Sequence, residues 1–361
     1  MATRPPARSA HPYHMYECIA EQPEAIARVI DSQASVAAEL AARIEAAARV
    51  HVVGIGTSWH ASLVSEHMLR AVGERHDARA WNAHEFVEHP PELLGEDVVI
   101  VLSHTGRKAI SRRALQLAHE AGATTALVTC DDTEADLSNT DLVLKTGGPD
   151  RSAAYTMSHT SAMTAMALVA ASISGTASGT AMGEIKALPD AISAAIATND
   201  QTKELAGRYA DSRWLAFAGG GHNAATAYEA ALKINEAAYL VTTGFELEQF
   251  LHGPFVATTS GCLVTLVAPP GRYHARAVQA ANAAKATGAA AMALVQAGDQ
   301  SFGSADDTIE LPAVADFLTP IVYLPPLQLF TYWLALQSGP NPDTFRMDQP
   351  EHKAAYDLYG L

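Results

Sequence analysis

Short runs of β-branched and aliphatic residues alternate along most of the chain with longer segments in which apolar residues recur at helical spacing. The run RVHVVG leads into a Gly-x-Gly turn and a helical segment, and the same order returns at EDVVIVLSHTG, ATTALVTC and DLVLKTGG. Strands that read as continuous apolar runs are typical of parallel sheets with helices on both faces. The pattern therefore predicts an α/β fold.

This strand–turn–helix pattern is present in two copies. The segment RWLAFAGGGHNAATAYEAALK looks like a repeat of the first strand, glycine turn and helix. Gly56 precedes Ser103 by 47 positions, and Gly221 precedes Ala268 by 47 positions. A later run, AAMALVQAG, matches ATTALVTC with an offset of two residues. A period of this length indicates duplicated domains, so we expect two similar doubly wound parallel-sheet lobes.

Composition shifts divide the chain into four predicted parts. They are residues 1–48, a lead and a helix over 15–48; 49–181, the first lobe; 182–338, the second lobe; and 339–361, an irregular tail that ends in a short helix. The first lobe closes with a low-complexity linker, SGTASGTA, at 174–181, and a helix is predicted around 184–197.

Charge and composition exclude several classes of protein. The 361 residues carry a formal net charge of −15 without an offsetting Lys/Arg run, so we expect no nucleic-acid partner. The most apolar stretch, 160–174, is too short for a membrane span, and the first 14 residues have no apolar core of a signal peptide. Three cysteines without close pairing indicate a reduced, cytoplasmic protein.

One loop differs between the two copies in a way that indicates phosphate binding. The first copy has Ser103, His104 and Thr105 before a glycine, followed by Lys108, whereas the second copy has APPG at 268–271. Hydroxyls and the N–H groups of a helix start are suitable donors for a phosphate dianion, and prolines have no N–H. We therefore expect the first copy to hold a phosphate and the second copy not to.

Thr57 and Ser58 stand at the start of the preceding helix and can add donors to the same phosphate. The alternative for these residues is ordinary helix capping by Ser and Thr.

The segment EAALKINEAAYL places Glu229, Lys233 and Glu236 on one helix face, at i, i+4 and i+7, in a run otherwise almost without charge. His252 follows in a His-Gly-Pro turn. A carboxylate, an amine and an imidazole can together move protons on a sugar carbon. The alternatives are an exposed i,i+4 ion pair between Glu229 and Lys233 and a structural role for His252.

Two cofactor classes do not fit the residues. A dinucleotide fingerprint at Gly54-Ile55-Gly56 fails because its third glycine falls on Trp59. A metal site at His84 and His89, or at His11 and His14, lacks the ligand spacing of known motifs. We expect neither a metal nor an organic cofactor.

Several of these segments resemble the sugar isomerase (SIS) domain family. ALKINEAAYL followed by ELEQFLHGP, the loop SHTG, the turn GTSWHA and the segment MYECIAEQPEAI are similar to the isomerase half of glucosamine-6-phosphate synthase. The tail motif NPDTFR looks like stand-alone SIS deaminases and deglycases. The resemblance covers residues 15–350 and implies two flavodoxin-like SIS lobes.

The resemblance also implies roles for residues. A phosphosugar would be held through its phosphate by a set of residues of the first lobe: Thr57, Ser58, Ser103, His104, Thr105 and Lys108. In the second lobe, Glu236 would carry a proton between C1 and C2, His252 would open the sugar ring, Lys233 would stabilise the oxyanion, and Glu229 would contact the substrate. In related enzymes the histidine comes from a second subunit, so a homodimer with shared active sites is expected.

Two departures from the family pattern narrow the reaction. Lys108 stands where the family has a Ser or Thr, and it either pairs with the phosphate or points outward. The tail position that carries the synthase's sugar-binding lysine is Ala355, so the nearby Lys353 either replaces that catalytic lysine from a shifted register or plays no such part, which would favour deaminase or deglycase chemistry over amino transfer. The synthase's glutaminase domain does not precede this sequence, so glutamine-independent isomerase, deaminase or deglycase chemistry is expected. A phosphosugar-sensing module without catalysis is the alternative, because SIS domains also serve as regulators.

Overall fold

The computed structural model describes residues 5–131, 135–174 and 178–359, which form two compact units. Glu21–Asp150 and Met157–Pro189 belong to the first unit. Pro5–Ala20, Arg151–Thr156 and the chain from Asp190 onwards belong to the second. The chain therefore passes between the units several times.

The first unit is built on a five-stranded parallel sheet with the order β2-β1-β3-β4-β5. Its strands are β1 (Val50–Gly54), β2 (Arg79–Asn82), β3 (Val98–Leu102), β4 (Thr124–Thr129) and β5 (Leu142–Lys145). Every residue of β1 and β3 is buried, as expected for apolar runs in a sheet that is covered on both faces.

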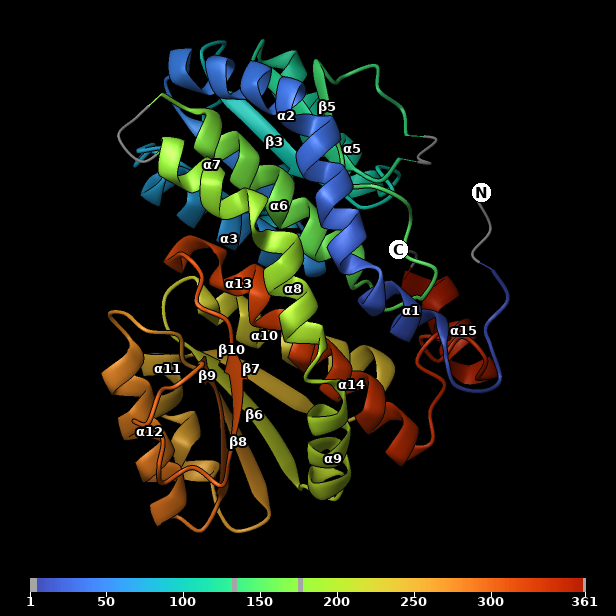
Figure 1. Cartoon of the computed structure of the whole chain (residues 1–361). Helices are drawn as coiled ribbons and strands as arrows, with labels where there is room; N and C mark the ends of the chain where they lie inside the picture. Colours follow the sequence, from blue (N-terminus) through green and yellow to red (C-terminus); the bar gives the residue numbers. More distant parts are fainter. Residues whose placement is uncertain (1–4, 132–134, 175–177, 360–361) are drawn as a thin grey trace. The chain divides into compact units, whose positions relative to one another are not determined.

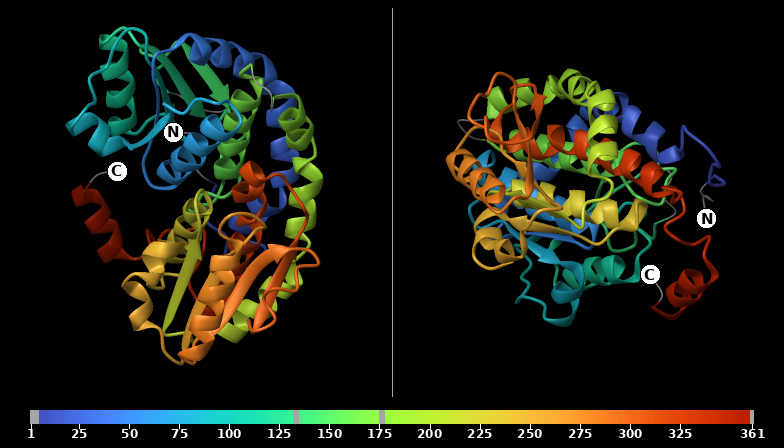
Figure 2. Two further views of the ribbon diagram at one scale, coloured as in Figure 1. Left: turned by 90° about the vertical axis from the view of Figure 1, so that its left-hand side faces the viewer. Right: turned by 90° about the horizontal axis from the view of Figure 1, so that it is seen from below.

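Helices cover both faces of this sheet (Figures 1 and 2). One face packs against α2 (Gln22–Ala46), α3 (Thr57–Ala71) and α6 (Met157–Ser172), and the other against α4 (Ala83–Glu88) and α5 (Ala109–Glu120). The apolar stretch at 160–174 lies mostly in α6, a helix buried on nearly all sides. Across the described part of the chain, none of the helices has both the length and the apolar character that a membrane crossing requires.

The second unit repeats this architecture. Its parallel sheet has the order β10-β9-β8-β6-β7, with strands β6 (Trp214–Gly219), β7 (Thr242–Glu246), β8 (Cys262–Val267), β9 (Ala290–Gln296) and β10 (Asp307–Leu311). Read from β7, this is the strand order of the first sheet. The two lobes predicted from the internal repeat are confirmed.

The helices of the second unit also follow the repeat. One face of the sheet carries α9 (Asn199–Tyr209), α10 (Asn223–Ala237) and α14 (Leu324–Ser338), with α13 (Thr319–Val322) after a short 3-10 turn, η2 (Asp316–Leu318). The other face carries α11 (Leu247–Leu251) and α12 (His274–Ala286), and the 3-10 turn η1 (Pro254–Ala257) follows α11. Gly56 and Gly221, just before α3 and α10, share a φ of +58°, a conformation that favours glycine.

The predicted helix over 15–48 is wrong in one respect, because it is two helices. α1 (His14–Ala20) ends before Glu21, and α2 begins at Gln22 with Pro23 in its first turn. Proline has no N–H to continue the preceding helix, yet its fixed φ suits a helix start. The break lets α1 pack in the second unit and α2 in the first.

The region of the predicted linker also differs from expectation. Residues 175–177 of the linker at 174–181 lie outside the described residues, and the rest of it from Ser178 opens α7 (Ser178–Lys186). The helix predicted around 184–197 is divided between α7 and α8 (Leu188–Ile196), with Pro189 in the first turn of α8.

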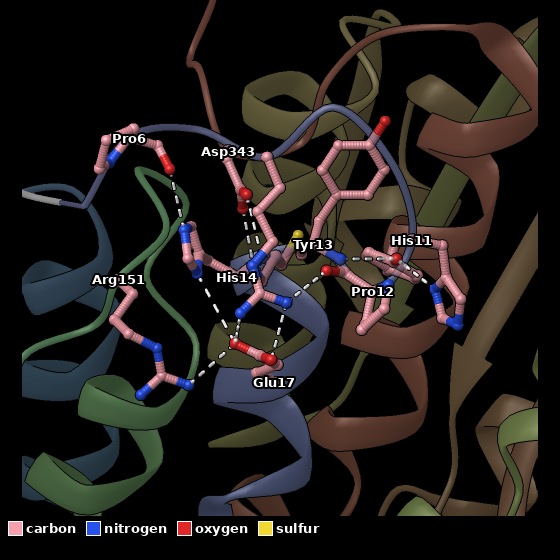
Figure 3. Close-up of polar contacts among 11 residues, drawn as sticks. Pro6, His11, Pro12, Tyr13, His14, Glu17, Arg151 and Asp343 are labelled. Carbon is pink, nitrogen blue, oxygen red and sulfur yellow. Dashed lines mark hydrogen bonds and ion pairs between the residues drawn. The ribbon is translucent and has the colours of Figure 1, made fainter.

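Within the second unit, the N-terminal segment is fastened to the tail (Figure 3). The Asp343 carboxylate accepts hydrogen bonds from the backbone N–H groups of His14 and Met15, both at 2.9 Å, at the start of α1. Glu17 pairs with Arg8 at 2.8 Å and with Arg151 at 3.5 Å. These contacts fix the chain just before the tail helix, α15 (Pro350–Tyr359).

Candidate functional site

The carboxyl edge of the first sheet gathers the predicted phosphate-binding residues. β1 and β3 are adjacent and parallel, and the strand order changes direction between them. Ligands of open α/β sheets bind at such a switch point. Thr57 and Ser58 follow β1 in the first turn of α3, and the loop 103–108 joins β3 to α5, so both groups lie at this edge.

The backbone of the loop after β3 is held in place by hydrogen bonds. The N–H of Gly106 donates to the Ser103 carbonyl at 3.0 Å and closes a tight turn. The His104 carbonyl accepts from the N–H of Cys130 at 2.9 Å and from the Thr129 hydroxyl at 3.0 Å. A backbone anchored in this way presents its donors without further ordering, which favours binding.

The side chains around the loop are only partly covered. Thr57, Ser58, His104, Thr105 and Lys108 are half-buried. Ser103 is buried, with 5% of its surface exposed. The first turn of α5 can supply N–H groups that a helix leaves without an intrahelical partner. In the first turn of α3, the N–H groups of Ser58 and Trp59 donate to the carbonyls of Ile55 and Gly56, so this turn can contribute mainly hydroxyls.

Helix capping, the alternative explanation for Ser58, does not apply at the N-cap of α3. That position is Gly56, which has no side chain. Lys108 is the N-cap residue of α5 and makes no side-chain cap hydrogen bond. Arg107, half-buried in the same loop, was not singled out from the sequence. Its position next to the hydroxyl-bearing residues of the loop is the sequence signal that could have identified Arg107 as a further candidate for contact with a phosphate.

The equivalent edge of the second sheet is filled by a side chain. A Cβ placed on Gly220 would come within 2.2 Å of the Tyr273 ring, and one on Gly221 within 2.7 Å. The aromatic ring therefore lies directly against the glycine turn after β6. Together with Pro269 and Pro270, which have no N–H, this supports the expectation that only the first lobe binds a phosphate.

Ser103→Ala is expected to raise the Kd for a sugar phosphate by about 10- to 100-fold, because a hydrogen bond to a charged group is lost. Isothermal titration calorimetry would measure the change. Ser301→Ala, a loop serine of the second unit, serves as the matched control and is expected to leave the Kd unchanged. Equal affinity of the wild type and Ser103→Ala would remove this loop from the phosphate site.

The face of α10 predicted from the sequence carries a linked group of charges. The Lys233 ammonium lies 3.3 Å from the Glu229 carboxylate and also hydrogen-bonds to the Glu236 carboxylate. Glu229 and Lys233 are fully buried, so the alternative of an ordinary exposed ion pair is wrong. The side chain of Glu236 keeps 16% of its surface exposed.

The charge state of Lys233 follows from these contacts. Burial by itself lowers the pKa of the Lys233 ammonium, but the two carboxylates outweigh burial and raise the pKa above its usual value. Lys233 is therefore a cation, and it holds the Glu236 side chain in one orientation.

Glu236 opens onto a cavity within the second unit. The cavity has a volume of about 530 Å³, within the range of about 300–1,000 Å³ that is typical of ligand pockets. Its walls come from the end of α10, the segment that follows it and the tail: Leu232, Asn235, Glu236, Tyr239, Leu240, Val241, Phe345, Arg346, Met347, His352 and Tyr356. The tail was predicted as irregular, and its part in this wall was not anticipated.

Two other predicted residues, His252 and Lys353, are exposed and do not line this cavity. His252 directly follows α11, and α11 and α10 cover opposite faces of the second sheet. The His252 side chain is 75% exposed, with its Nε2 3.5 Å from Glu248. Lys353 lies on α15, where it is 59% exposed and 3.4 Å from Asp357.

Comparison with known proteins extends these observations. The model of the SIS domain family matches residues 43–172 and 208–338, one segment in each lobe. A relative from Thermococcus kodakarensis, named glutamine–fructose-6-phosphate aminotransferase [isomerizing], is 30% identical over 345 residues. The match covers 93% of this chain and 57% of the relative, so the chain spans little more than half of that protein's length.

Solved structures share the fold. The C-terminal domain of glucosamine-fructose-6-phosphate aminotransferase from Francisella tularensis has a TM-score of 0.84 at 18% identity, covering 92% of this chain and 99% of that chain. Tagatose-6-phosphate ketose/aldose isomerase from Escherichia coli has a TM-score of 0.80 at 21% identity, covering 95% and 98%. Two matched segments, two equivalent sheets and these structural neighbours agree: the chain belongs to the SIS domain family.

Proposed function

We propose that this chain is an enzyme of the phosphosugar isomerase type. Its substrate would be a ketose or aldose 6-phosphate or an amino-sugar phosphate. The observation that carries the proposal is the Glu236 carboxylate, which is oriented by a buried ammonium and opens onto a cavity of about 530 Å³. A pure binding module has no need of an oriented carboxylate with a buried counter-charge.

In the proposed reaction, Glu236 takes the proton from the carbon next to the carbonyl, C2 of an aldose or C1 of a ketose. The electron pair of that C–H bond forms the double bond of an enediol, or of an enolamine when the sugar carries nitrogen. The proton then returns to the neighbouring carbon, while a second proton moves between the two oxygens. Substrate and product are isomers, so no oxidant or reductant is consumed.

Lys233 contributes to this reaction through Glu236. Its ammonium is buried and bonded to two carboxylates, so direct stabilisation of an oxyanion would require it to leave them. We therefore assign Lys233 a positioning role. Glu229, also buried, completes the charge balance around the ammonium and acts on substrate only through it.

The phosphate would bind at the first-sheet edge, through Ser103, Thr105 and the turn at Thr57 and Ser58. The names of the Thermococcus and Escherichia proteins mention a ketose 6-phosphate and a ketose/aldose isomerase, which supports a ketose 6-phosphate as substrate. We further propose that glutamine is not used as nitrogen source by this chain. All three of its cysteines are buried, so none is presented as a nucleophile for glutamine.

The substrate assay that tests this function uses three compounds. Fructose 6-phosphate with and without ammonia, glucosamine 6-phosphate, and a fructosyl-amino-acid 6-phosphate would each be incubated with the protein. Products would be followed by mass spectrometry, with glutamine added in a parallel series. Turnover of one phosphosugar supports the proposal, and dependence on glutamine would contradict the nitrogen-source part. Binding of all three without turnover would favour a phosphosugar-sensing module instead.

We also propose that His252 acts in the active site of a second copy of this chain. His252 is exposed and lies on the face of the second sheet opposite to α10, and Val256 beside it is 88% exposed. Exposed apolar surface next to a functional residue is typical of an interface. His252 would then supply the acid/base group for ring opening in the partner's site.

Mixing two inactive variants tests this arrangement. Glu236→Gln and His252→Ala, each inactive alone, are expected to regain about one quarter of the wild-type activity when refolded together in equal amounts. In a symmetric dimer with shared sites, half of the dimers are mixed, and each mixed dimer has one intact site. No recovery after confirmed subunit exchange would show that each site is built from one chain.

A further inference from the structure

The cavity beside Glu236 has walls that do not match a sugar alone. Five of its side chains are aliphatic or aromatic without a polar atom that could bind a hydroxyl strongly: Leu232, Leu240, Val241, Phe345 and Met347. Sugar hydroxyls left without partners against such a wall would lose their hydrogen bonds to water. The other six lining residues carry polar side-chain atoms, so the cavity suits a ligand that joins a hydrocarbon part to polar groups.

One cation lines this apolar wall. The Arg346 guanidinium stacks on the Tyr239 ring, 4.4 Å from its centroid, and one of its nitrogens donates to the Tyr239 carbonyl at 3.4 Å. Another nitrogen lies 2.9 Å from Nε2 of His352, which must be the acceptor because a guanidinium has only donors. A guanidinium has five N–H donors, so this fixed fork retains donors for a carboxylate.

The backbone around Arg346 is held in an unfavourable conformation. Tyr239, Phe345 and Arg346 adopt φ values of 60°, 53° and 55°, and all three line the cavity. In the described part of the chain, Glu74 is the only other non-glycine residue with positive φ. Such strain is maintained by its surroundings and gathers at ligand sites.

Hydrogen bonds to Tyr239 maintain this conformation. The Tyr239 hydroxyl accepts from the N–H of Arg346 at 2.7 Å and pairs with the Thr344 hydroxyl at 2.9 Å. Asp343, the residue before Thr344, is anchored to the start of α1, as Figure 3 shows. The guanidinium is thus placed by contacts on both sides of it rather than by a mobile tail.

We propose that this cavity is a subsite for a substituent of the phosphosugar that combines a carboxylate with a hydrocarbon side chain, such as an apolar amino acid joined through its nitrogen. Arg346 binds the carboxylate, and the apolar wall covers the side chain. The substituent is carried by the carbons at which Glu236 moves a proton, because Glu236 lines the same cavity. This inference rests on the proposed phosphosugar function and specifies its substrate class.

Matched ligands and variants test the subsite. The first ligand is leucine joined to C1 of 1-deoxyfructose 6-phosphate, the second is its leucinamide counterpart without the carboxylate, and the third is fructose 6-phosphate. Affinities would be measured by calorimetry in a Glu236→Gln background, so that no ligand is consumed. The acid is expected to bind about 10- to 100-fold more tightly than the amide, since a charged bidentate hydrogen bond separates them.

Arg346→Met is expected to abolish this difference by weakening the acid alone, and Arg346→Lys to restore part of it. The amide in the same variant controls for any loosening of the tail. Arg213→Met, at an exposed arginine outside the cavity, is expected to change neither affinity. Equal binding of acid and amide by the unmutated background would overturn the subsite.

The remaining outcomes separate this inference from the function on which it rests. If Arg346→Met weakened the binding of acid and amide equally, the guanidinium would bind the phosphate or only hold the tail in place. This result would also overturn the subsite. Turnover of fructose 6-phosphate by the wild type without any preference for the acid would reject the subsite and leave the isomerase proposal standing. Failure of all three phosphosugars to bind would reject both.

Discussion

Glu236→Gln is expected to lower the rate of phosphosugar turnover by about 10²- to 10⁴-fold, the usual contribution of a general acid/base group. Glutamine keeps the size of the side chain and can still accept a hydrogen bond from Lys233, but it cannot carry the proton between carbons. The affinity for the phosphosugar is expected to remain, because the residues proposed to bind the phosphate lie in the first lobe. Steady-state kinetics with the preferred substrate, together with calorimetry, would measure both quantities.

Glu204→Gln is the matched control for this variant. Glu204 lies on α9, is 71% exposed and pairs with Arg208, so its replacement is expected to leave turnover unchanged. Full activity of Glu236→Gln would remove Glu236 from the role of base. A matching loss of phosphosugar affinity would instead indicate that the carboxylate holds the substrate.

Lys233→Met is expected to have the largest effect on stability, lowering the free energy of unfolding by about 3–5 kcal/mol, because a buried charge pair loses one partner. Glu229 has no exposed surface and would be left as a buried carboxylate beside a thioether. Activity is expected to fall as well, since Glu236 loses the contact that orients it. Urea unfolding and hydrogen exchange of the α10 amides would report the global and local effects.

Two further variants isolate the cause of this loss. Glu229→Gln combined with Lys233→Met removes the stranded charge and is expected to recover part of the stability, which a double-mutant cycle would quantify. Lys285→Met breaks a surface pair with Asp306 at 2.5 Å, and its cost is expected to stay below about 1 kcal/mol. Equal costs for Lys233→Met and Lys285→Met would mean that burial of the triad contributes nothing.

Local features of the sequence were sufficient to predict which helix face carries the charges and which loop carries the hydroxyls. The spacing of Glu229, Lys233 and Glu236 places them on one face of any helix, whatever it packs against. The two copies differ in that the first loop has hydroxyls and the second has prolines. This difference can be read from the sequence, because whether a residue can donate a hydrogen bond depends on its type. Continuous apolar runs likewise predict buried parallel strands, and both sheets are built in this way.

Features that depend on residues distant in sequence could not be predicted. Whether Lys233 is exposed or buried depends on what covers α10, and only packing shows it. The Tyr273 ring lies against Gly220 across more than 50 residues of sequence. Pro23 is a sequence signal for the break between α1 and α2. No local signal in the sequence indicates that the two helices belong to different units.

By itself, the sequence determined the duplicated α/β architecture, the hydroxyl-bearing loop of the first lobe and the charged face of α10, because propensity, period and donor chemistry are local. The tertiary structure decided that Lys233 is enclosed by two carboxylates, that Glu236 keeps an opening, and that Arg346 shares its cavity. The position of Arg346 depends on Tyr239, which lies more than 100 residues earlier in the chain. Tyr239 holds the tail in a backbone conformation that the local sequence disfavours. Contacts of that range arise only when the chain has folded.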